Sequence, residues 1–378
     1  MKRPVKRVSP LPRPLRAILR LLGRLLGRGG RRLGHGGHAR VVAGAALLTL
    51  AACALPARPA VGVEGAPGSP AAAERALDAA DGWDTLPVAG GVEIAYRVVG
   101  RGEPTVVVPA GTIVGDVEPL AARHRVVLYD PRGRGRSTRY GPELAVSLEH
   151  DLADLEALRA ALGLERIALL GISYYGAFVA LYAAERPERV ERLVMAGPMA
   201  LSAESFAGGW EPEAEAEKAA ADAAAEAELA ALRAEGLEAA DPAAYCRAYY
   251  RAYAPGLYAD PERFDPASVA ASCELPNERP ASLSAWAGAL FGALGEWDFA
   301  ERLHGVRAPA LILQGRQDRR TPPAGAGELA ATIPDARVLW IDDCGHVPLK
   351  ERPEVAYPAV LEFLAGAWPE AAAHPAGP

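Results

Sequence analysis

Apolar positions in the first half of the chain follow two alternating patterns. Short runs rich in β-branched residues, bounded by turn residues, predict buried parallel strands. Between them, leucines recur at the spacing of one helical face. The predicted strands span residues 92–99, 105–108, 126–129, 167–171 and 193–196, and the predicted helices span 148–162 and 176–185. Strands that alternate with helices predict a mostly parallel central sheet covered by helices, which is an α/β fold.

The alternation stops near residue 199 and resumes near residue 300. The segment between contains no convincing strand pattern: 211–240 is rich in Ala and acidic residues, and 245–253 is strongly aromatic. We therefore predict a helical insertion that interrupts the sheet. Strand patterns then return at 309–315 and 337–341, and a final helix is expected at about 355–367. The predicted organisation is a first core part at 83–198, an inserted helical cap at 199–300, a second core part at 301–370 and a tail at 371–378.

A serine at position 173 marks an abrupt change of pattern. The apolar run before it ends between small and aromatic residues, and an amphipathic segment follows at once. This predicts a strand, a sharp turn and a helix, with the Ser173 hydroxyl at the end of the sheet. A hydroxyl becomes a good nucleophile only when a base takes its proton. Asp318 and His346 each follow a predicted strand and have the chemistry of an acid and a base; Asp342 and Asp343 are fallback acids.

The order Ser173, Asp318, His346 resembles the α/β-hydrolase family over about residues 90–367. The resemblance implies that Ser173 is the nucleophile, that His346 is the general base and then the acid, and that Asp318 orients the imidazole. It also implies an oxyanion hole made by the backbone N–H groups of Tyr174 and Thr112. The segment 130–137 resembles a structural loop of the same family, and we assign it no catalytic role.

One position departs from the family pattern. A small residue is usual two places after the nucleophile, but Tyr175 stands there and Gly176 follows. The Tyr175 ring must therefore pack in the core, which we favour, or line the pocket.

The substrate is less defined than the chemistry. The 245–253 segment and the Asp260-Pro261 pair resemble proline-iminopeptidase-like and tripeptidyl-aminopeptidase-like enzymes, whose cap carboxylates can bind a free amino group. The candidates here are Glu211, Glu213, Glu215 and Glu217, although the solvated face of a helix is the simpler interpretation. We expect a serine hydrolase of ester or amide bonds, with aminopeptidase-like activity favoured over a carboxylesterase or lipase-like one. An acyltransferase on the same triad and a non-catalytic binding lipoprotein on a hydrolase scaffold remain alternatives.

The amino terminus has the composition of a bacterial export signal. Residues 1–52 contain 12 Lys and Arg and no Asp or Glu, and they end in an apolar run at 41–52 that is too short to span a bilayer. The run closes on Leu-Ala-Ala-Cys, which resembles the lipoprotein processing box, so Cys53 is a candidate for lipidation. An ordinary cleaved signal is the alternative, and the true start codon stays open. Residues 53–82 are rich in Pro, Ala and Gly, a composition that indicates a flexible tether between the amino-terminal segment and the core. We expect an exported protein of the cell envelope, anchored through Cys53, or a secreted one.

Charge and cysteine content limit the partners. The part of the chain after residue 52 contains 29 of the 41 basic residues and all 47 acidic ones, so its formal net charge is −18. This argues against nucleic acid and anionic lipid as direct ligands, so we expect a small-molecule or peptide substrate, with the membrane reached only through the anchor. No metal-ligand cluster or nucleotide fingerprint is visible in the sequence, so we expect no metal and no cofactor. Outside the cytosol Cys246 and Cys273 could form a disulfide, although the sequence leaves their pairing open.

Overall fold

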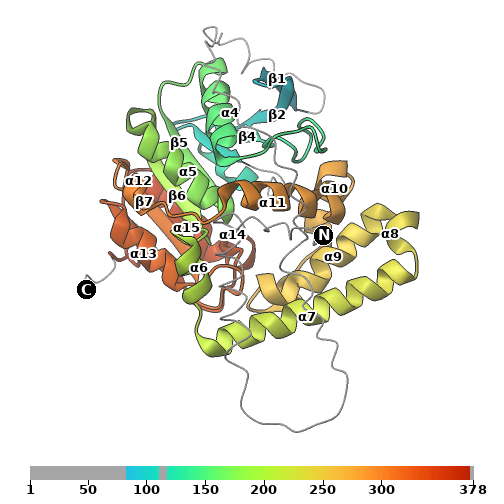
Figure 1. Ribbon diagram of the computed structural model, residues 1–378. Coiled ribbons are helices and arrows are strands. Elements are labelled where there is room, and N and C mark those ends of the chain that lie inside the picture. Colours follow the sequence, from blue (N-terminus) through green and yellow to red (C-terminus); the bar gives the residue numbers. More distant parts are fainter. Residues whose placement is uncertain (1–81, 110–116, 375–378) are drawn as a thin grey trace, which may run out of the picture. The chain divides into compact units, whose positions relative to one another are not determined.

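The computed structural model describes residues 82–109 and 117–374, and these residues contain one eight-stranded sheet (Figure 1). The strand order is β1-β2-β4-β3-β5-β6-β7-β8. Strands β3 to β8 run parallel to one another, and only β1 and β2 are antiparallel to their neighbours. The strands are β1 (Asp84–Val88), β2 (Val92–Val99), β3 (Val106–Pro109), β4 (Val126–Tyr129), β5 (Ile167–Ile172), β6 (Val190–Ala196), β7 (Ala310–Gly315) and β8 (Ala336–Ile341). The predicted mostly parallel sheet is confirmed.

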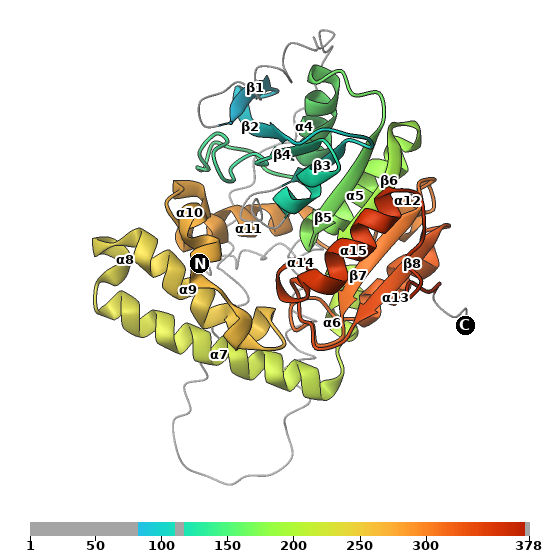
Figure 2. The ribbon, with the colours of Figure 1, turned by 180° about the vertical axis from the view of Figure 1, so that it is seen from behind.

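Helices cover both faces of this sheet, which explains why a central strand such as β5 is apolar throughout. All six residues of β5 are buried, as they must be in a strand with helices above and below it. One face carries α4 (Leu148–Ala161), α5 (Tyr174–Glu185), α12 (Ala300–Leu303) and α13 (Ala324–Thr332). The other face, seen in front in Figure 2, carries α14 (Pro348–Glu351), α15 (Pro353–Leu364) and the 3₁₀ helix η2 (Glu118–Ala122). The leucines that predicted α4 are all buried on its sheet-facing side.

Between β6 and β7 the chain leaves the sheet and forms the cap. Its helices are α6 (Ala203–Gly208), α7 (Pro212–Ala234), α8 (Leu237–Ala240), α9 (Pro242–Leu257), α10 (Ala270–Cys273) and α11 (Pro280–Leu294), with 3₁₀ turns η4 (Pro261–Arg263), η5 (Pro266–Val269) and η6 (Pro276–Glu278). Helices α7 and α9 lie side by side (Figure 1). Tyr245, Tyr249 and Tyr253 of α9 pack against Ala225 and Leu229 of α7. The aromatic segment is therefore packing within the cap.

A disulfide joins two helices of the cap, α9 and α10. Cys246 of α9 and Cys273 of α10 are joined, with their Cα atoms 5.5 Å apart. Val269 packs against the buried pair, with Tyr250 and Phe264 partly covering it. The bond ties the short turns after α9 back to that helix, where few apolar contacts would otherwise hold them.

A buried ion pair joins the cap to the sheet. Arg134, in the loop after β4, donates from Nη2 to Glu278 Oε2 at 2.8 Å, and neither side chain is open to solvent. Gly135 N also donates to Glu278, at 2.7 Å. Burial alone would raise the pKa of Glu278, but the charge of Arg134 and its hydrogen bonds hold that pKa below its usual range. Breaking one half of such a pair leaves an uncompensated buried charge, so this contact fixes the cap on the core.

The two ends of the described chain differ from expectation in small ways. Strand β1 was not predicted from the sequence; Pro87 lies inside it, and a proline argues against a central strand. Strand β1 is at the edge and pairs only with β2, where a proline is tolerated. In the predicted tail, Ala373 exchanges two hydrogen bonds with Val338 and so forms a single bridge to the edge strand β8.

No helix within the described ranges is long and apolar enough to cross a membrane. The proposed export segment and Cys53 lie outside the described residues.

Candidate active site

Ser173 occupies a strained turn between β5 and α5. Its backbone has φ 58° and ψ −125°, a conformation that is costly for any residue with a side chain, by about 1–3 kcal/mol. Two main-chain hydrogen bonds hold it: Ser173 N donates to Ala196 O at 3.1 Å, and Met199 N donates to Ser173 O at 2.9 Å. The strand and helix also meet closely here, because a Cβ on Gly171 would overlap the Tyr175 carbonyl. The surroundings therefore impose the strain, as is typical of a functional turn.

The unusual Tyr175 is accommodated by glycines on either side of the nucleophile. A Cβ on Gly176 would lie 3.0 Å from Pro198 Cβ. Gly171 and Gly176 therefore allow the strand and the helix to approach closely, which is the role that a small residue at position 175 would otherwise have. The half-buried Tyr175 ring lies 6.4 Å from the Trp286 ring of α11, and its hydroxyl accepts from Arg134 Nη1 at 3.4 Å. Tyr175 thus belongs to the junction between the turn and the cap.

Asp318 and His346 form a buried acid–base pair. His346 Nδ1 lies 2.9 Å from Asp318 Oδ2, and the two residues are 6 % and 1 % exposed. Burial would raise the pKa of Asp318, but the charge of His346 and its hydrogen bond, with backbone donors, hold that pKa below its ordinary value. An ionised carboxylate only accepts hydrogen bonds, so the proton of a neutral imidazole sits on Nδ1 and leaves Nε2 as the basic nitrogen.

Several further donors fix the Asp318 carboxylate. Oδ1 accepts from the backbone N–H groups of Arg320, at 2.7 Å, and Thr321, at 3.0 Å. Oδ2 accepts from Thr321 Oγ1 at 2.8 Å and from Gln314 Nε2 at 3.1 Å. Sequence reasoning missed Thr321 and Gln314. The spacing of an aspartate and a threonine three residues later is the signal that could have identified the first, because it is typical of a turn that satisfies the carboxylate locally.

The sheet brings the three sequence-predicted residues to one edge. Ser173 follows β5, Asp318 follows β7 and His346 follows β8, all at the carboxyl ends of parallel strands. Gly197, which follows β6, lies between them. A Cβ there would stand 3.1 Å from His346 Nδ1 and 3.4 Å from Asp318 Oδ2, while the preceding residue, Ala196, bonds to Ser173 N.

The fallback acids do not contact the imidazole. Asp342 Oδ1 pairs instead with the exposed Arg316, at 2.8 Å. The Asp343 side chain is 85 % exposed and its φ of 48° turns the chain toward His346. Asp318 is thus the carboxylate that meets the ring.

Of the two expected oxyanion donors, the structure describes one. Tyr174 is the first residue of α5, where backbone N–H groups have no partner within the helix and the helix dipole favours negative charge. Its hydroxyl donates to Asp151 Oδ2 at 2.9 Å, which anchors the residue from the other side. Burial raises the pKa of Asp151 to about 7. Thr112, the second expected donor, lies outside the described residues.

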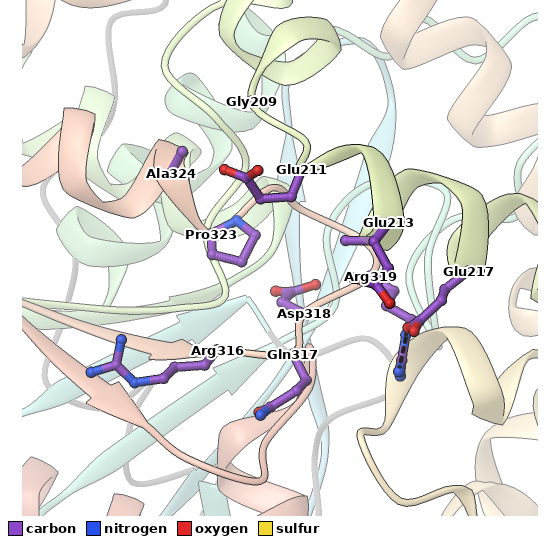
Figure 3. A pocket seen from close by; sticks show the side chains of 11 residues that line it. Gly209, Glu211, Glu213, Glu217, Arg316, Gln317, Asp318, Arg319, Pro323 and Ala324 are labelled. Carbon is purple, nitrogen blue, oxygen red and sulfur yellow. Dashed lines mark hydrogen bonds and ion pairs between the residues drawn. The ribbon is translucent and has the colours of Figure 1, made fainter.

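A pocket of about 390 Å³ opens beside the acid loop, between the start of α7 and the β7–α13 connection (Figure 3). The residues that line it include Asp318 but neither Ser173 nor His346. The pocket therefore borders the acid but does not reach the predicted nucleophile or base. All four glutamates considered as amine ligands are exposed, and Glu211, Glu213 and Glu217 line this pocket. Glu217 is paired with Arg319 at 2.8 Å. Their exposure fits the solvated face of a helix. Across the described residues, no group of three His, Cys, Asp or Glu side chains is placed to hold a metal ion.

Comparisons with known proteins identify the family of the chain. Residues 116–353 match the family model described as alpha/beta hydrolase fold. The chain is 30% identical over 300 residues to the 2-hydroxy-6-oxo-2,4-heptadienoate hydrolase of Pseudomonas putida, covering 74% of this chain and 95% of that one. A segment of 103 residues is 36% identical to the proline iminopeptidase of Xylella fastidiosa, covering 26% of this chain and 33% of that one. A thermophilic esterase from Thermogutta terrifontis superimposes with a TM-score of 0.55 at 26% identity, covering 75% and 98%. The chain therefore belongs to the α/β-hydrolase fold family.

Proposed function

We propose that this chain is a serine hydrolase that cleaves ester or amide bonds through an acyl-enzyme on Ser173. The observation that carries the proposal is the buried 2.9 Å contact between His346 Nδ1 and Asp318 Oδ2, at the sheet edge where the strained Ser173 turn lies. A nucleophile, a base and an orienting acid on three strand ends suit acyl transfer.

In the first half-reaction Ser173 Oγ attacks the substrate carbonyl carbon while His346 Nε2 takes the hydroxyl proton. The negative oxygen of the tetrahedral intermediate accepts from the Tyr174 N–H and, as we expect, from Thr112. Asp318 stabilises the imidazolium. The bond to the leaving group then breaks, and His346 gives its proton to that group, which leaves an ester on Ser173.

In the second half-reaction a water molecule attacks the acyl carbon and gives its proton to His346 Nε2. The new intermediate collapses with cleavage of the bond to Ser173 Oγ, which takes the proton back. A carboxylic acid is released and the enzyme returns to its starting state.

A fluorophosphonate probe tests this chemistry directly. The wild-type protein should be labelled covalently on Ser173, and Ser173→Ala, checked for folding by circular dichroism, should not be labelled. Folded wild-type protein that resists the probe would refute the proposal. Ligand binding without turnover of any substrate would then favour the non-catalytic scaffold.

Among substrates, an aminopeptidase-like preference for a free amino group comes first. The 36% identity with a proline iminopeptidase over 103 residues supports it, while the similarity to a thermophilic esterase supports a carboxylesterase as the second candidate. Within the cap, the buried Glu278 is already neutralised by Arg134, so it would not serve as the carboxylate that binds an ammonium group. Turnover of a panel of nitrophenyl esters and of aminoacyl and prolyl arylamides distinguishes an esterase from a peptidase. If turnover is lost when the amino group of the substrate is acetylated, the enzyme is a peptidase that requires a free amine. Product analysis with added alcohols or amines detects transfer to acceptors other than water.

We also propose that the protein is exported and anchored by a lipid on Cys53. The acid-free basic start, the short apolar run and the cysteine after two alanines support this. Cells fed an alkyne fatty acid should yield labelled wild-type protein in the membrane fraction. Cys53→Ser should be unlabelled. Unlabelled wild-type protein in the culture medium would instead indicate an ordinary signal peptide.

A further inference from the structure

Glu351 is a buried carboxylate between the His346 loop and the cap. It ends the short helix α14 and is 2 % exposed. Its Oε2 accepts from Gly345 N at 2.6 Å, which is the residue directly before His346. Its Oε1 accepts from the backbone N–H groups of Ala259, at 2.7 Å, and Asp260, at 3.2 Å, which follow α9 of the cap. One side chain thus joins two segments that are about ninety residues apart in the chain.

Main-chain contacts run alongside this link. His346 N donates to Leu257 O, the last residue of α9, at 2.7 Å. Arg263 of η4 donates from Nη1 to Glu351 O at 2.9 Å. The histidine is therefore attached to the cap through its own backbone as well as through its neighbour.

The loop has little room to move between its neighbours. A Cβ on Gly345 would lie 2.5 Å from Leu257 O and 2.8 Å from Ala259 N, so the loop touches the cap closely. On the other side, a Cβ on Gly315 of β7 would overlap the carbonyl oxygens of Cys344 and Gly345. A shift of the cap end would therefore be transmitted to His346, whose ring must stay within hydrogen-bond reach of Asp318.

We propose that Glu351 is a positioning residue, which holds His346 against Asp318 through Gly345 and makes that position depend on the cap through Ala259 and Asp260. This inference rests on the proposed serine-hydrolase function. It assigns to the cap a part in setting the base, in addition to any part in binding substrate.

Glu351→Gln tests it with little change of shape. The amide keeps one acceptor oxygen, but its NH₂ group must face backbone N–H donors that previously met a carboxylate oxygen. We expect kcat per folded molecule to fall about 10²-fold, with KM within about twofold of wild type, because a base displaced by about 1 Å loses this much. The pH profile of kcat/KM should also differ from that of the wild type, because the contact between His346 and Asp318 is altered.

Glu354→Gln is the matched control. Glu354 is three residues away, lies at the surface and pairs with Arg352 at 2.7 Å, so its amide should leave kcat and the pH profile unchanged. Glu351→Asp, which keeps the charge but shortens the reach, should give an intermediate kcat and serves if the glutamine variant does not fold.

Thermal unfolding separates positioning from stability. If Glu351→Gln or Glu351→Asp lowers Tm but leaves kcat, the pH profile and the fluorophosphonate labelling rate of the folded fraction at wild-type values, Glu351 is only structural and the inference is wrong. Failure of wild-type labelling is a different result, because it refutes the serine-hydrolase proposal itself.

Discussion

Replacing Asp318 by Asn tests the acid–base pair at its most sensitive point. The carboxylate accepts from two side chains on Oδ2, besides His346, and from two backbone N–H groups on Oδ1. An asparagine can keep its oxygen toward the backbone donors of Arg320 and Thr321. Its NH₂ group then faces His346 Nδ1, which must become an acceptor, so the imidazole proton moves to Nε2.

The expected loss follows from that change of tautomer. An imidazole protonated at Nε2 cannot take the proton from Ser173 Oγ, although the turn at Ser173 and the backbone N–H of Tyr174 are unaltered. When the orienting acid of such a triad becomes an amide, kcat falls about 10⁴-fold, which at about 1.36 kcal/mol per decade is about 5.4 kcal/mol of transition-state stabilisation. KM should change little, because Asp318 is 1 % exposed and lies behind the imidazole.

Stopped-time hydrolysis of whichever ester or arylamide the wild type turns over, together with the rate of fluorophosphonate labelling, measures this loss. Asp342→Asn and Asp343→Asn are the controls, because both side chains are solvent-exposed and neither meets the imidazole. If Asp318→Asn keeps more than a tenth of the wild-type kcat, or if Asp342→Asn loses as much, the assignment of the acid is wrong.

Two further predictions concern stability. The double variant Cys246→Ala, Cys273→Ala should lower the free energy of unfolding by about 3.5 kcal/mol, because the unfolded chain is no longer closed over a 27-residue separation. In urea titrations of this variant a reductant should have no additional effect. An unchanged urea midpoint would contradict the prediction. Asp151, whose burial raises its pKa from 3.8 to about 7, stays protonated in the folded protein over a range in which the unfolded chain is ionised. Its contribution to stability is therefore present below about pH 4 and is lost as the pH rises to 7, with a slope of up to about 1.4 kcal/mol per unit. Asp151→Asn should remove that slope, and parallel pH curves for variant and wild type would argue against it.

Much of the sheet could be predicted from the sequence because strands such as β3, β4 and β5 are uninterrupted apolar runs, and α4 could be predicted from its leucine face. The covering helices α12, α13 and α14 were not predicted, because each is short and contains a single leucine. The positions of Asp318 and His346 could also be predicted, since both directly follow such runs and parallel strands end at one edge. Strand β1 could not, because it is a short edge strand with Pro87 inside it.

The contacts that hold the cap were beyond sequence reasoning. Arg134 and Glu278 are 144 residues apart and Glu351 and Ala259 are 92 apart, so no local pattern connects them. A charged residue is usually exposed, and Glu278 and Glu351 become buried only because the folded chain supplies a guanidinium in one case and backbone N–H groups in the other. The same applies to Tyr175, whose environment depends on Trp286 of the cap.

The insertion of the cap between β6 and β7 also affects how the protein is made. Strand β6 ends at Ala196 and its neighbour β7 begins only at Ala310, so a ribosome has to synthesise the whole cap before the sheet can be completed. During that interval β6 is an edge with unpaired backbone groups, the kind of surface that templates aggregation. The unfinished chain already carries Ser173 but lacks both Asp318 and His346. On the proposed mechanism, the nascent protein therefore cannot activate Ser173 while it is most prone to misassociate, because the proposed acid and base are synthesised only with the strands that close the exposed edge.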